Sequence, residues 1–130
     1  MGLPQNTAKL LAVYESTYTL PQFEDFRKGL ESELIVAQNY LSKNRWIAHR
    51  KKVFGTEIDL IFENKSQLIL VEVKRSNNDD FFNWRLSRKQ KQRLEAVYIR
   101  AIQHIHKEVQ FHYVIASPSG EIFIFDDFLG

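Results

Sequence analysis

Three ionisable residues stand in two short apolar segments of this chain. Asp59 lies within the run Glu57–Ile61, and Glu72 and Lys74 close the run Leu70–Lys74. Side chains alternate along a strand, so Glu72 and Lys74 point the same way. If the segments pair as a hairpin, Asp59 and Glu72 come side by side. Two carboxylates beside apolar surface need compensation, which a divalent metal ion would provide, and Lys74 would face a substrate phosphate.

A plainer interpretation is an ordinary hairpin. Glu72 and Lys74 would then be strand-end charges, and Asp59 would pair with a nearby Lys or Arg. Spacing alone does not decide between this interpretation and a metal site.

The surrounding periodicity predicts the elements that position these residues. Apolar residues at helical spacing predict a helix over residues 22–43, with Glu33 beside its apolar stripe. Ser87 is a plausible N-cap for a second long helix that ends near His106. We expect strands at residues 45–54, 57–63, 67–74, 109–116 and 121–125, with Gly55 at a bend and a turn over 63–67.

This order predicts an α/β fold with a mixed five-stranded sheet flanked by helices. A helix that connects two neighbouring strands requires them to be parallel, whereas a short turn makes them antiparallel. The 130 residues are expected to form one domain. Residues 1–20 are expected to be an N-terminal helical extension, with a short helix over residues 7–19.

The segment Gly55–Lys74 resembles the signature of the YraN-like family, an uncharacterised group with the PD-(D/E)XK endonuclease fold. That superfamily places an Asp near the end of one strand and an acid-x-Lys on the next, which match Asp59 and Glu72-Val73-Lys74. The resemblance extends over about residues 26–128 and implies a restriction-endonuclease-like core. At position 113 this chain has Tyr where many relatives have Asp.

The resemblance implies a site for Mg²⁺ or Mn²⁺, which prefer hard oxygen ligands. Asp59, Glu72 and the Val73 carbonyl would be ligands, and Lys74 would position a water and stabilise charge on the phosphate. Glu33 would hold a metal-bound water from the first long helix. From the later helix, Gln90 or Gln92, together with Lys89, would bind the phosphate or the water.

Basic residues gather in two windows without acids, 43–52 and 85–93. Such windows beside carboxylates fit a nucleic-acid backbone. The candidate contacts are Arg50, Lys51, Lys52, Arg75, Arg88, Lys89 and Gln92. The alternative is a solvated helix face and an edge strand protected by lysines. Four aromatic residues could stack on bases, although a core role is preferred for them: Trp46, Phe81, Phe82 and Trp84.

Composition excludes a membrane helix and several kinds of covalent or metal site. A hydrophobic fraction of 44% supports a packed core, and no run approaches the ~18 apolar residues of a membrane helix. The absence of Cys excludes disulfides and thiolate metal sites, and the four His have poor spacing for a zinc site. With no secretory signal at the start, a cytoplasmic location is expected. A homodimer is one option, because two-fold dimers are common.

The sequence therefore predicts a metal-dependent nuclease that hydrolyses DNA phosphodiester bonds, with branched or damaged DNA as one candidate substrate. DNA is favoured over RNA. Two alternatives are a nucleic-acid-binding protein without catalysis and a protein-interaction domain that retains the fold. Retention of Asp59, Glu72 and Lys74 together favours the enzyme.

Overall fold

A computed structural model describes residues 24–76 and 87–126 of the chain. The predicted order of elements is confirmed in this part, with boundaries that move by at most three residues. The predicted N-terminal extension lies outside the described residues. The elements are α2 (Glu24–Tyr40), β1 (Arg45–Val53), β2 (Thr56–Glu63), β3 (Gln67–Arg75), α3 (Arg88–His104), β4 (Glu108–Ala116) and β5 (Ile122–Phe125).

The sheet contains five strands in the order β1-β2-β3-β4-β5. The pair β3–β4 is parallel and the other three pairs are antiparallel, so the predicted mixed sheet is confirmed. The parallel pair is the one that α3 connects. Residues 63–67 form the predicted turn, where Asn64 Oδ1 accepts hydrogen bonds from the backbone N–H groups of Ser66 and Gln67, at 2.9 Å each.

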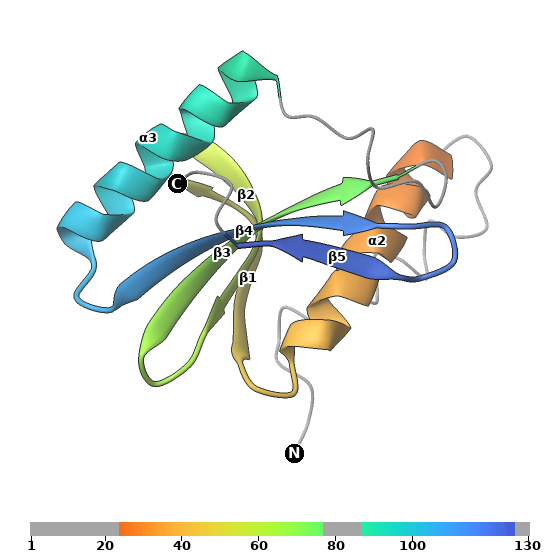
Figure 1. Ribbon diagram of the computed structural model, residues 1–130, viewed down its shortest axis with the longest axis horizontal. Coiled ribbons are helices and arrows are strands. Elements are labelled where there is room, and N and C mark those ends of the chain that lie inside the picture. Colours follow the sequence, from red (N-terminus) through yellow and green to blue (C-terminus); the bar gives the residue numbers. More distant parts are fainter. Residues whose placement is uncertain (1–23, 77–86, 127–130) are drawn as a thin grey trace.

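The two helices lie on opposite faces of the sheet (Figure 1). Leu30, Val36 and Ala37 of α2 pack on one face, and Leu94, Val97 and Ala101 of α3 pack on the other. Side-chain alternation assigns each strand position to a face. Leu70 of β3 and Phe111 of β4 pack with α3. Glu72 and Tyr113 lie two residues further along each strand, so they are also on the α3 face.

The N-terminal end of α3 is fixed by a cap. Ser87 is the N-cap, as predicted, and its side chain accepts a hydrogen bond from the backbone N–H of Gln90 at 3.1 Å. The cap satisfies one of the N–H groups that the first turn of a helix leaves without an intrahelical partner. It therefore sets where α3 begins, and with it the position of Gln90.

A two-residue turn joins β1 to β2. Phe54 and Gly55 both have positive φ, at 49° and 83°, which is the pattern of a type I′ hairpin turn. The predicted bend at Gly55 is confirmed. Asn, Asp or Gly is the usual choice at the first position of this turn, so a phenylalanine there is exceptional.

The preferred core role of Trp46 is confirmed, and base stacking by this residue is contradicted. Its side chain is only 2% exposed, its Nε1 donates to the carbonyl of Ala48, and its ring stacks on Phe62. The other three aromatic candidates lie outside the described residues. Within 24–76 and 87–126, neither helix has the length and hydrophobicity that a membrane crossing requires.

Candidate active site

The strands β2 and β3 separate at the position of the two predicted carboxylates. Their pairing ends at Leu60 and Val71, whereas β3 remains paired with β4 as far as Arg75. Asp59 and Glu72 are the next residues after that last pair. The predicted placement of these two side chains beside each other is confirmed, because their carboxyl groups are in hydrogen-bond contact. We call Asp59 and Glu72 the carboxylate pair.

Asp59 also replaces part of the missing strand pairing. The backbone N–H of Val73 donates a hydrogen bond to Asp59 Oδ2 at 2.9 Å. The N–H and C=O groups of one residue in an extended strand point to the same side. The Val73 carbonyl therefore also points toward the β2 side of β3, where Asp59 lies.

The carboxylate pair resists double ionisation. Burial, the hydrogen bond with Asp59 and the charges of Asp59, Glu33 and Glu57 together raise the pKa of Glu72 to about 10, with burial the largest cause. Burial also raises the pKa of Asp59. Two carboxyl groups in contact cannot both ionise at low cost, so the pair holds one proton at neutral pH in the absence of a cation.

Glu33 lies behind the pair, on α2, and is 5% exposed. Its Oε1 accepts a hydrogen bond from Arg50 Nε at 3.0 Å, and its Oε2 lies 2.9 Å from His49 Nε2. Arg50, a predicted nucleic-acid contact, is thus held in an ion pair that is mostly buried. Its positive charge also lowers the pKa of Asp59, which partly offsets the effect of burial.

The backbone explains why Arg50 turns toward α2. Its φ is 49°, a left-handed conformation that non-glycine residues rarely adopt. Both neighbouring residues of β1 remain paired with β2, so the departure is confined to this residue. Strained residues of this kind persist where surrounding interactions hold them, here through Glu33.

Replacing Arg50 tests this ion pair. Arg50→Met is expected to lower the free energy of unfolding by about 3 kcal/mol, because Glu33 keeps its charge in a buried position without this partner. Adding Glu33→Gln should recover most of the loss, since the charge is then gone. Urea unfolding of the two variants at pH 7 measures both values. A double variant as unstable as Arg50→Met alone would show that the unpaired charge of Glu33 is not the cause of the loss.

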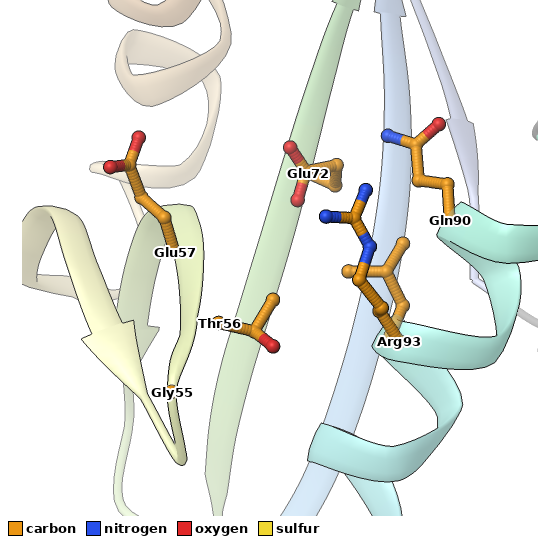
Figure 2. A pocket seen from close by; sticks show the side chains of 7 residues that line it. Gly55, Thr56, Glu57, Glu72, Gln90 and Arg93 are labelled. Atoms are coloured by element: carbon orange, nitrogen blue, oxygen red, sulfur yellow. The ribbon is translucent and has the colours of Figure 1, made fainter.

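A cleft of about 210 Å³ opens beside Glu72, between the β1–β2 hairpin and α3. Figure 2 shows Gln90 and Arg93 extending from α3 on one side and Thr56 and Glu57 on the hairpin side. Gln90 was a predicted site residue, and of the two glutamine candidates it is the one that lines this cleft. Gln92 is exposed on α3 away from the lining.

The remaining predicted residues lie on the surface around the site. Lys74 is exposed and, by alternation, is on the same face as Glu72. Arg75 is partly buried, at the end of β3. The other candidate contacts are all exposed, on β1 or in the first turn of α3: Lys51, Lys52, Arg88 and Lys89.

Three residues near the pair were not predicted as site residues. Glu57 and Arg93 line the cleft. Tyr113 pairs with Glu72 across β3 and β4 and is 1% exposed. Burial and the charges of Glu72 and Asp59 raise the pKa of Tyr113 to about 12. The sequence signal for Arg93 was its place in the basic window over residues 85–93.

The donors at this site are hard oxygens. Among the described residues, no three His, Asp or Glu side chains form a ready metal-binding group. What the site offers is two carboxyl groups in contact and a backbone carbonyl on the same side of the strand. This donor set matches Mg²⁺ or Mn²⁺, which keep several water ligands and often use only one or two carboxylates from the protein.

No model of a protein family matches the chain, and no curated protein matches it significantly. The resemblance of residues 55–74 to the YraN-like signature therefore rests on the motif residues themselves.

Proposed function

We propose that this protein is a metal-dependent nuclease that hydrolyses phosphodiester bonds, with DNA as the preferred substrate. The observation that carries the proposal is the contact between Asp59 and Glu72 at the point where β2 and β3 separate. Burying two carboxyl groups in contact costs stability in a purely structural protein. As part of the same proposal, the fold is restriction-endonuclease-like and the chain belongs with the YraN-like proteins.

Asp59 and Glu72 would hold the metal ion, with the Val73 carbonyl as a third donor. The fit rests on charge as well as donor type, because burial and mutual contact oppose the ionisation of both carboxyl groups, and a divalent ion would offset that cost. When bound, a divalent ion supplies an activated water and stabilises negative charge on the phosphate.

The remaining residues act on the substrate. The amino group of Lys74 is exposed on the Glu72 face, where it stabilises charge on the phosphate under attack. Gln90 and Arg93 line the cleft beside Glu72, so the amide and the guanidinium hold the adjoining phosphate oxygens. Glu33 keeps Arg50 beside Asp59, which makes both of them positioning residues.

Cleavage of labelled nucleic acid tests the proposal. Single-stranded DNA, duplex DNA, a branched DNA junction and RNA are each incubated with purified protein in Mg²⁺, in Mn²⁺ and in EDTA. We expect cleavage of DNA only when a divalent ion is present. Undiminished cleavage in EDTA would contradict the proposal. Binding without any cleavage would favour a nucleic-acid-binding protein that lacks catalysis.

A further inference from the structure

One edge of α3 carries basic side chains toward the β1–β2 hairpin. Lys89, Arg93 and Arg100 are four and seven residues apart, so they lie within about 40° of one another around the helix. All three are exposed. Contacts place this edge against the hairpin, because Arg93 lines the cleft with Gly55, and Arg100 lies over the ring of Phe54 at 6.0 Å. We call these three residues the α3 basic edge.

Phe54 closes the far end of this surface. The residue is 42% exposed, and its ring lies 5.7 Å from the ring of His104, centroid to centroid. Phe54 has a φ of 49°, a backbone conformation that is unfavourable for a bulky side chain, so the hairpin turn is strained at this residue. A large exposed ring retained in a strained turn is an outlier of the kind that points to function.

We propose that the α3 basic edge and Phe54 form a track for a single-stranded segment of nucleic acid that leads into the cleft beside Glu72. This inference rests on the proposed function and names its substrate class. The basic edge contacts the phosphates, and Phe54 stacks on an unpaired base. From Lys89 to Arg100 the helix extends about 16 Å, which accommodates more than one phosphate.

Charge and shape favour a single-stranded nucleic acid as the occupant of this surface. The edge holds three cations, and among the described lining residues the acids are Glu72 and Glu57, which lie at the end next to the carboxylate pair. Bases inside a duplex do not expose their faces, whereas an unpaired base does, so the exposed ring of Phe54 selects for single strands.

Salt dependence of binding tests the phosphate contacts. Binding of a fluorescent 20-nucleotide single strand is measured over a range of salt concentrations without divalent ions. Arg93→Gln and Arg100→Gln should each weaken binding several-fold and reduce the slope of log K against log salt by about 0.7. Lys65→Gln is the matched control, because Lys65 is exposed in the turn at the opposite end of β3. If the salt slopes of Arg93→Gln and Arg100→Gln equal the slope of the Lys65→Gln control, the proposed track is wrong.

Phe54→Asn tests stacking without endangering the fold. Asn-Gly is the preferred type I′ turn, so this variant should fold at least as stably as the wild type. We expect single-strand binding to weaken about tenfold with an unchanged salt slope, and duplex binding to stay the same. Equal effects on single strand and duplex, or no effect on either, would overturn the role of Phe54.

The two proposals fail in different ways. Binding is measured without divalent ions, so cleavage does not enter it. Metal-dependent cleavage together with unaltered binding by the three edge and ring variants would overturn the track and leave the nuclease. Variant-sensitive binding without cleavage in any metal would overturn the nuclease and leave the track.

Discussion

Asp59→Asn is expected to reduce metal-dependent cleavage of DNA at least about a thousandfold. The substitution preserves shape, and the amide oxygen can still accept the hydrogen bond from the Val73 N–H. The substitution removes one of the two negative charges that would hold the metal ion. A bound metal ion stabilises the transition state by several kcal/mol. A loss of about 4 kcal/mol corresponds to a thousandfold change in rate.

Single-turnover cleavage by wild type and variant in Mg²⁺ and in Mn²⁺ measures this effect. Glu108→Gln is the matched control, since Glu108 is an exposed acid at the opposite end of the sheet, paired with Gln67. It should cleave as the wild type does. If rigorously purified Asp59→Asn retains the activity of this control, Asp59 is not a metal ligand and the proposed site is wrong.

Glu72→Gln is expected to stabilise the metal-free protein while it abolishes cleavage. In the folded wild type, the carboxylate pair keeps a proton that Glu72 of the unfolded chain releases above its ordinary pKa of 4.5. The folded state then binds more protons, so stability falls as pH rises between 4.5 and about 10. A glutamine has no such proton, and its amide can donate to Asp59 as the protonated carboxyl does.

The difference in free energy of unfolding between Glu72→Gln and wild type should grow by up to about 1.4 kcal/mol per pH unit. Urea unfolding in EDTA at pH 6, 7 and 8 measures it. Saturating Mn²⁺ should reverse the order at pH 8, because the ion stabilises only the protein that binds it. A difference that stays constant with pH, or that shrinks as pH rises, would show that the pair does not hold the proton.

Local patterns were sufficient to predict the hairpin that brings the carboxylate pair together. Short apolar runs mark β2 and β3, and the Asn64 turn sets their register, so the approach of Asp59 to Glu72 depends on fewer than twenty residues. The N-cap at Ser87 was predictable for the same reason, because its hydrogen bond joins residues only three positions apart in the chain. Predictions of this kind need no knowledge of how distant segments meet.

Distant pairing accounts for what the sequence did not reveal. Tyr113 reaches Glu72 through the parallel register of β3 and β4, which α3 separates in the chain. Arg93 looked equivalent to its basic neighbours until the packing of α3 placed it in the cleft. Arg50 looked like a surface residue of a basic run. Its left-handed backbone, which an arginine in the sequence does not indicate, turns it toward Glu33.

Calorimetric titration of Mn²⁺ into the metal-free protein tests the central claim most directly. Measured in buffers of different ionisation enthalpy, it counts the protons released when the ion binds. We predict one site in the wild type, release of about one proton per ion at pH 7, and loss of binding in both Asp59→Asn and Glu72→Gln. Binding that survives in both variants, or a wild type that binds no ion even with uncleaved DNA present, would contradict the account.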